Sequence, residues 1–176
     1  MIDYTIKTYM DEIPEYTDKT VRLLSQNPQV VGLLVNDPNV DIVEDEIDVT
    51  KTGTKQILSY NFIPDTQKDV KTYICVNTIS DSALNEKIKS CVMSVSIYSH
   101  KQDVELDSSK FIGLIGCRFD NIARFADKAI RDNANANYGI GKIQLKQRTP
   151  MRDIVIGTDY VGKQLLYEVE CFNKMR

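Results

Sequence analysis

The chain has 176 residues, of which 42% are hydrophobic and 27% charged, and its formal net charge is −3. This length and hydrophobic content suit a single folded domain over residues 1–176 and exclude a disordered chain. Neither half is basic enough for a nucleic-acid footprint, and the sequence has no apolar leader and no run of about 20 apolar residues, so we expect a soluble protein made in the cytoplasm.

Two short helices are predicted near the amino terminus, between Tyr16 and Asn36. Apolar residues recur there at nearly helical spacing, at Val21, Leu24, Val31, Leu34 and Val35. Thr17 is a candidate N-cap for the first helix. Asn27 followed by Pro28 is typical of a second helix start, because asparagine caps helix ends and proline fits the first helical position.

An acidic segment follows, from Asp37 to Thr54. Apolar periodicity disappears there, and carboxylates crowd the segment at Asp37, Asp41, Glu44, Asp45, Glu46 and Asp48. Because it lacks the glycine and the oxygen spacing of a calcium loop, a solvated loop or arm is the simplest interpretation. A second interpretation turns Asp41, Glu44, Asp45, Glu46 and Asp48 towards a lumen, where their charge would repel a passing DNA backbone.

Three segments in the middle of the chain have the pattern of strands. Gln56–Phe62 and Val70–Val76 are joined by turn-forming residues. Cys91–Ser99 alternates between apolar and polar residues, as a half-buried strand does. This alternation places Tyr98 on the polar face. Phe172 falls on the polar face of a later strand, and exposed aromatic residues of this kind favour a protein interface.

One long helix and two further strands complete the predicted fold. Apolar residues recur every three or four positions from Phe111 to Ile130, which predicts an amphipathic helix of about five turns, capped by Ser108 or Ser109. Ile143–Arg148 and Leu165–Phe172 alternate as antiparallel strands. The expected fold class is α+β: an antiparallel sheet of about four to five strands packed by one long helix, with N-terminal short helices and the acidic arm.

The segment Gly157–Gln164 is similar to a phosphate-binding P-loop, but Gln164 stands where that motif needs serine or threonine. A P-loop leads from a strand into a helix, whereas the residues from Lys163 onward alternate as a strand. We therefore interpret the segment as a hairpin turn.

Other candidates for chemistry are isolated. His100 is the only histidine, and it ends a strand without an acid or nucleophile placed beside it. Glu168 and Glu170 share the polar face of one strand. The four cysteines lack zinc or redox spacing and are expected to be buried free thiols: Cys75, Cys91, Cys117 and Cys171. We expect no catalytic residues, no cofactor and no metal. A small enzyme or ligand-binding domain, the alternative, would need a deep pocket around His100, Glu168 or Glu170.

Several segments together resemble proteins of tailed phages that infect Gram-positive bacteria, of the neck and tail-terminator (tail completion, head-tail joining) kind. They are the predicted long helix, Tyr60–Pro64, Ile97–Lys101, Tyr138–Lys142, Tyr160–Lys163 and Tyr167–Asn173. The resemblance covers about two thirds of the chain and leaves residues 1–54 outside.

The resemblance implies a structural virion protein that forms a homo-oligomeric ring, a hexamer, between the tail tube and the head connector. DNA would pass through the ring without specific binding, and no membrane is involved. A close alternative is a head-completion or stopper ring. The contact loops implied are residues 133–142 and 148–163, and the candidate interface residues are Tyr98, Tyr138, Gly139, Ile140, Arg148, Arg152, Tyr160 and Phe172.

Overall fold

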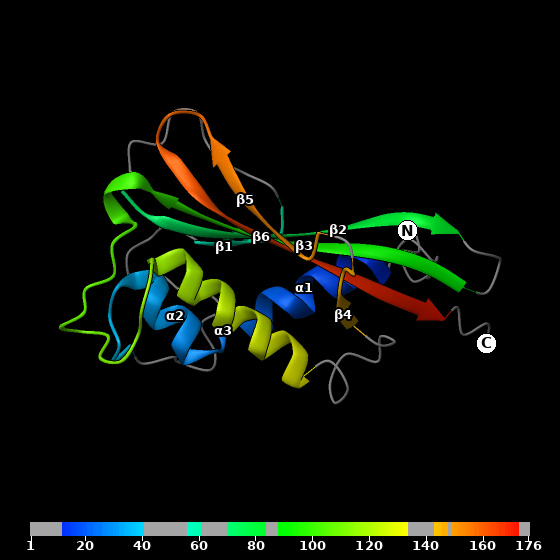
Figure 1. Cartoon of the computed structure of the whole chain (residues 1–176). Helices are drawn as coiled ribbons and strands as arrows, with labels where there is room; N and C mark the ends of the chain where they lie inside the picture. The colour runs from blue at the N-terminus through cyan, green and yellow to red at the C-terminus, as the bar shows by residue number, and fades with distance from the viewer. Residues whose placement is uncertain are drawn as a thin grey trace, which may run out of the picture.

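The computed structural model describes residues 12–40, 56–60, 70–83, 88–133, 143–147 and 149–172. These residues form a mostly antiparallel sheet of six strands with three α-helices on one face, which confirms the expected α+β class (Figure 1). None of the helices in these ranges is long and apolar enough to cross a membrane. The elements are α1 (Glu12–Ser25), α2 (Pro28–Val35), β1 (Ile57–Leu58), β2 (Thr72–Ala83), β3 (Ile88–His100), the 3₁₀ helix η1 (Lys101–Asp103), α3 (Arg118–Asn133), β4 (Ile143–Leu145), β5 (Met151–Ile156) and β6 (Tyr160–Phe172).

The sheet is built around β3, which pairs along its length with β2 on one side and β6 on the other. The strand order is β1-β2-β3-β6-β4. β5 also pairs with β6, at residues 160–165, whereas β4 pairs with residues 167–169. Only the short pair β1 and β2 is parallel. Sequence alternation predicted β3 and most of β6 because each has one face against the helices.

The main core lies between the sheet and the three helices. Register places Val76, Val95 and Leu165 side by side on this face of the sheet. They meet apolar residues of the helices, such as Leu24 of α1 and Ile122 of α3, and all five side chains are buried. The burial of these stripes is the main source of stability in the fold.

The opposite face of the sheet holds a second, smaller cluster. It consists of the buried residues Leu58, Tyr73, Cys75, Tyr98 and Tyr160. Ile154 and Ile156 of β5 pack against it, so the β5–β6 hairpin helps to cover this face. The prediction that Tyr98 is exposed was therefore wrong: it is 7% exposed, and burial raises the pKa of its hydroxyl. Tyr160 is buried as well, which leaves both tyrosines little surface for a partner.

The amino-terminal helices follow the prediction except at the first cap. Asn27 accepts hydrogen bonds from the backbone N–H groups of Gln29 and Val30, and Pro28 is the first residue of α2, as expected. Thr17 lies inside α1, which begins at Glu12, so it is not an N-cap. Its hydroxyl instead donates to the Thr78 hydroxyl of β2 at 2.9 Å and joins the helix to the sheet.

The long helix is shorter than predicted, because α3 begins at Arg118 and not at Phe111. Gly113 and Gly116 have φ values of 84° and 92°, which an α-helix does not accommodate. Residues 104–117 therefore form a loop. Ser109 does not cap a helix there, and its hydroxyl donates to the Asp107 carboxylate within the loop.

The P-loop-like segment is a hairpin, as predicted. Gly157 has a φ of 57° and opens the turn between β5 and β6. Lys163 lies within β6, where its ammonium group pairs with the carboxylates of Asp120 and Asp153. The Asp120 carboxylate accepts a hydrogen bond from this ammonium and raises the pKa of Lys163.

Gly162 is required where the backbone of β6 lies close to that of β3, opposite Tyr98. A Cβ atom at this position would lie 1.8 Å from the carbonyl oxygen of Ile97. Gly162→Ala should therefore force the two central strands apart and lower the free energy of unfolding by about 3 kcal/mol, measured by urea denaturation. Thr158→Ala, in the exposed hairpin turn, is the control and should change it by less than about 0.5 kcal/mol. Equal effects of the two substitutions would contradict the close approach.

Tyr167 gives the stability an alkaline pH dependence. Burial raises the pKa of its phenol, and the Asp127 carboxylate, which accepts its hydrogen bond at 3.1 Å, raises it further. The folded state holds this proton more tightly than the unfolded chain, so the stabilisation is complete below about pH 10 and falls by about 1.4 kcal/mol per pH unit above it.

Tyr167→Phe removes this titration. The other tyrosines are the same in the wild type and the variant, so their titration cancels in the difference between the two. The stability advantage of the wild type over the variant should therefore shrink as pH rises above about 10, in urea unfolding at a series of pH values. A difference that stays constant with pH would contradict the prediction.

Candidate functional site

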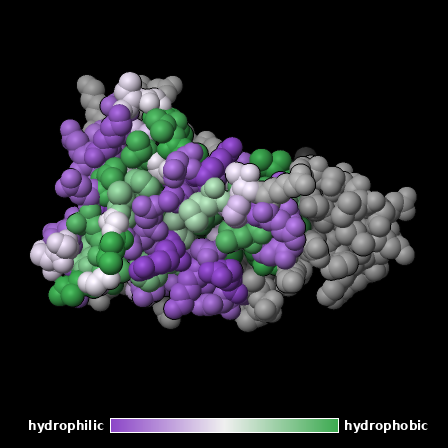
Figure 2. Space-filling model, in the orientation of Figure 1, coloured by the Kyte–Doolittle hydropathy of each residue, from purple (hydrophilic) through white to green (hydrophobic). Residues whose placement is uncertain are grey.

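The most exposed large apolar side chains in the described part of the chain are Ile112 and Ile115, each 88% exposed. They lie on residues 104–117, which we call the isoleucine loop, between η1 and α3. This loop projects at the left end of the molecule in Figure 1, where Figure 2 shows hydrophobic atoms at the surface. Exposed apolar residues that gather in this way are typical of interaction sites.

Turn chemistry fixes the first half of the isoleucine loop. The carbonyl of Asp107 accepts hydrogen bonds from the backbone N–H groups of Lys110 and Phe111, at 3.1 and 3.0 Å. Its carboxylate accepts from both the N–H and the hydroxyl of Ser109. The Ser109 hydroxyl holds the pKa of Asp107 below its ordinary value. This part of the loop therefore has a defined, hydrogen-bonded conformation.

The second half of the isoleucine loop is held by the first turn of α3. The side-chain amide of Asn121 donates to the carbonyls of Ile115 and Cys117, both at 3.0 Å. The backbone N–H of Arg118 donates to the Val104 carbonyl at 2.9 Å and closes the loop. The backbone that carries Ile115 is therefore fixed although its side chain faces solvent.

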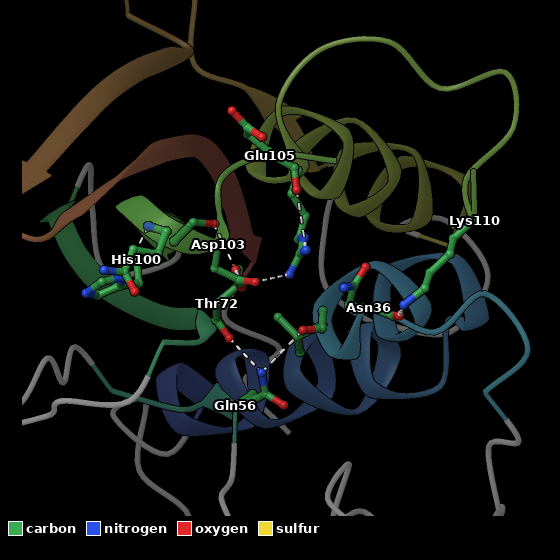
Figure 3. A network of polar contacts seen from close by, with 11 residues as sticks. Asn36, Gln56, Thr72, His100, Asp103, Glu105 and Lys110 are labelled. Carbon is green, nitrogen blue, oxygen red and sulfur yellow. Dashed lines mark hydrogen bonds and ion pairs between the residues drawn. The ribbon is translucent and has the colours of Figure 1, made fainter. Parts of the chain in front are cut away.

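A buried ion pair anchors the base of the loop (Figure 3). The Arg118 and Asp103 side chains are 5% and 17% exposed, and Nη1 of Arg118 lies 2.5 Å from Oδ1 of Asp103. The Arg118 guanidinium also donates to the backbone carbonyl of Glu105 at 3.4 Å. Two charges buried in this way are stable only when each satisfies the other.

The same network reaches the sheet and α2 (Figure 3). The Thr72 hydroxyl of β2 donates to Oδ2 of Asp103 at 2.8 Å and contacts the Ser99 hydroxyl of β3 at 2.9 Å. The Gln56 amide donates to the Thr72 carbonyl at 2.9 Å and to the Leu34 carbonyl of α2 at 3.3 Å. Hydrogen bonds between residues distant in sequence thus connect the base of the loop to β2, β3 and α2.

A pocket of about 410 Å³ lies beside the loop, between α2 and α3. Its apolar lining comes from all three elements and includes Leu33, Phe111, Ile112, Leu114 and Phe125, while Ile115 is not among the lining residues. Its size falls in the range of binding pockets. We call it the α2 pocket.

The α2 pocket carries basic side chains beside its apolar lining. Lys110 is a lining residue, and its ammonium group lies 3.5 Å from the Asn36 carbonyl at the end of α2 (Figure 3). The Arg124 guanidinium lies over the ring of Phe125, 4.8 Å from its centre. Lys110 is therefore the one charged side chain among the described lining residues, and Arg124 stacks on one of them.

The candidates for catalysis lie elsewhere. Nδ1 of His100 accepts the backbone N–H of Gln102 at 3.2 Å, and its ring packs edge-on against Tyr160, so it caps η1. Glu168 is partly exposed on β6, on the sheet face away from the helices, and the side chain of Glu170 lies outside the described residues. Neither His100 nor Glu168 lines the α2 pocket. Within the described ranges no three metal-ligating side chains cluster.

Of the predicted interface residues, Arg152 is exposed on β5, where Nε donates to the Gln164 amide oxygen at 2.6 Å. Phe172 belongs to β6, but its side chain lies outside the described residues. The remaining predicted positions also fall outside them: Tyr138, Gly139, Ile140 and Arg148, together with the acidic residues Asp41, Glu44, Asp45, Glu46 and Asp48. For these residues the expected roles stay predictions.

Sequence reasoning missed Ile112 and Ile115 as surface residues because it counted residues 111–117 into the long helix. A signal was present in Gly113 and Gly116, since two glycines within one turn disfavour a helix. Arg118 and Asp103 carry no such signal, because their pairing depends on the turn made by the intervening loop.

The ion pair at the base of the loop yields a stability prediction. Asp103→Ala would leave the Arg118 charge buried and uncompensated, so urea unfolding should show a loss of about 3–5 kcal/mol. Asp18→Ala is the matched control, because it breaks an ion pair with Arg22 in which both side chains are more than half exposed. The control should lose less than about 1 kcal/mol. Similar losses in the two variants would contradict an anchoring role for Asp103.

A protein-family model matches most of the chain. Residues 21–169 match the YomW family model, a range that includes the isoleucine loop, the α2 pocket and the polar network. No curated protein and no solved structure matches the chain. Because the matched range is more than half of the chain, the protein belongs to the YomW family.

Proposed function

We propose that this protein is a structural virion protein, a tail-terminator or neck subunit that forms a ring between the tail tube and the head connector. The observation that carries the proposal is the pair of isoleucines, each 88% exposed, on a loop held by hydrogen bonds and a buried ion pair. Burying such a side chain against a partner is worth about 1.5–3 kcal/mol. In an assembly, these two side chains would be buried against a partner and would contribute to binding.

The fixed conformation of the isoleucine loop supports a role in assembly. A mobile loop would lose conformational entropy when a partner immobilised it, and this loss would weaken binding. Here Asn121 and Arg118 already hold the loop backbone in the free chain. Contact with a partner would therefore cost the loop little conformational entropy.

The β5–β6 hairpin supplies a second surface for assembly. It curves away from the helices in Figure 1, and within the described residues β5 is hydrogen-bonded along one edge, to β6. Met151 and Val155 of β5 are 47% and 69% exposed. The hairpin lies within the contact range of residues 148–163 expected from the sequence. More than one contact surface suits a subunit that must bind neighbours in its ring as well as proteins above and below it.

The place of the ring in the virion comes from the resemblance to neck and tail-terminator proteins described above. On that basis the ring is a hexamer, DNA passes through it without specific binding, and the role is not enzymatic. A head-completion or stopper ring would use the same kinds of surface. Binding partners separate these neighbouring roles, because a terminator caps tail tubes and a stopper sits under the connector.

The proposal is tested on the purified full chain. Mass measurement in solution and negative-stain electron microscopy over a range of concentrations should show a closed ring, with the mass of six subunits. Incubation with purified tail tubes should place the ring at one end of the tube. A chain that stays monomeric at high concentration and binds neither tail tubes nor connectors would overturn the proposal.

A further inference from the structure

We infer that β5 takes up an extended segment of another protein, which adds to the sheet as one more antiparallel strand on the side of β5 away from β6. The segment carries an aliphatic, a basic and an aliphatic residue at alternate positions, opposite Val155, Asp153 and Met151. The inference rests on the proposed function, because it names the partner that the β5–β6 hairpin takes in an assembly.

Half of the backbone groups of β5 point away from β6. The N–H of Leu166 donates to the Pro150 carbonyl, so these two residues form a hydrogen-bonded pair of the antiparallel ladder. Such pairs alternate along a ladder, and the residues between them direct their backbone groups to the other side of the strand. The register therefore turns the N–H and C=O groups of Met151, Asp153 and Val155 outward. Within the described part of the chain, nothing is hydrogen-bonded to these outward groups.

The side chains of β5 leave this edge open. Nε of Arg152 donates to the amide oxygen of Gln164 at 2.6 Å, which fixes the guanidinium beside β6. Edge strands are ordinarily protected from other strands by free charges, by bulges or by a covering element. Here Met151 and Val155 are 47% and 69% exposed next to the outward backbone groups. An added strand would gain hydrogen bonds and would bury both of these side chains.

Asp153 selects a basic residue at the centre of the partner segment. Its side chain is 87% exposed and lies between Met151 and Val155 on the same face of the strand. Lys163 on β6 is 3.8 Å away and also pairs with Asp120 of α3. The Asp153 carboxylate therefore keeps acceptor sites for a second cation. A residue opposite Asp153 on an added strand would have its Cβ atom about 5 Å from that of Asp153.

β6 shows which residues suit this face of β5. On the inner side, the register places Val161, Lys163 and Leu165 opposite the three residues with outward backbone groups. This run is the one place in the sequence where Lys or Arg has Val, Ile, Leu or Met both two places before it and two places after it. β6 is already paired on both sides, with β3 and with β5. A second copy has no other run of this pattern to offer, so the partner is a different protein.

Peptide binding to the full chain tests the charge. One peptide has the sequence Thr-Val-Thr-Lys-Thr-Leu-Thr, and a second has glutamate in place of the lysine. Fluorescence anisotropy of labelled peptides should show the lysine peptide binding about tenfold more tightly, because the glutamate peptide replaces attraction to Asp153 by repulsion. Asp153→Asn should remove this preference. Equal binding of both peptides to the wild type would overturn the assignment of a basic residue to the partner.

Backbone pairing has its own readout. In amide hydrogen exchange followed by NMR, the lysine peptide should protect the outward N–H groups of Met151, Asp153 and Val155 from exchange. In an antiparallel pair, the N–H groups of the valine, lysine and leucine of the peptide face β5. Methylation of these three nitrogens should abolish binding, whereas methylation of the threonine nitrogens should leave it. Equal binding of the two methylated peptides would contradict strand addition.

A pair of variants tests the same edge from the side of the protein. Val155→Pro removes one outward N–H and leaves the ladder to β6 intact, because proline is accepted at an edge position whose N–H points away from the sheet. It should weaken binding of the lysine peptide at least about tenfold. Val155→Thr keeps the N–H and should retain most of the binding. Circular dichroism checks that both variants fold, and the methylated peptides test the edge without any variant.

The outcomes separate this edge from the proposed ring. Wild-type rings that bind neither peptide would overturn the strand addition and leave the ring standing. A chain that stays monomeric and binds the lysine peptide would overturn the ring and support the strand addition. Outward N–H groups that are protected without peptide, and lose that protection on dilution, would place a second copy at β5 and overturn the assignment to another protein.

Discussion

The conformation of the isoleucine loop depends on the buried ion pair between Arg118 and Asp103. Arg118 begins α3, Asp103 ends η1, and their contact draws together the two ends of the isoleucine loop. A buried guanidinium without a carboxylate partner would be strongly destabilising, so the chain must bring these two residues together. Thr72 extends the constraint to the sheet by donating to the same carboxylate. The position of the loop is therefore fixed by polar contacts to α3 and to the sheet.

The sequence predicted the parts of the fold that follow a regular period. Alternation identified β3, and Asn27 with Pro28 identified the start of α2, because both signals are local. The start of α3 was wrong because apolar residues in a loop can keep a helical period by packing on the core, as Phe111 and Leu114 do. Tyr98 was misplaced for a different reason. Its burial depends on Ile154 and Ile156 of β5, which lie more than 50 residues away in the chain.

The candidate site was harder to predict than the fold, because it consists of tertiary contacts and of exposure. Gln56, Thr72 and Asp103 meet only after β2, β3 and η1 are in place. No local pattern marks an isoleucine as exposed, since isoleucine is among the residue types most often fully buried. Two glycines in residues 111–117 were the one local sign that the apolar period there did not belong to a helix.

The isoleucine loop serves two purposes at once, as the wall of the α2 pocket and as the support of Ile115. Both therefore depend on the anchor formed by Arg118, Asp103 and Asn121. A ring of such subunits would repeat this anchor at every contact, and each contact would have the same geometry only if the loop were equally rigid in every copy. In the proposed ring, this requirement would give a role to the internal hydrogen bonds of the backbone that carries the two exposed isoleucines. Rigidity at that position is a condition for closing a ring.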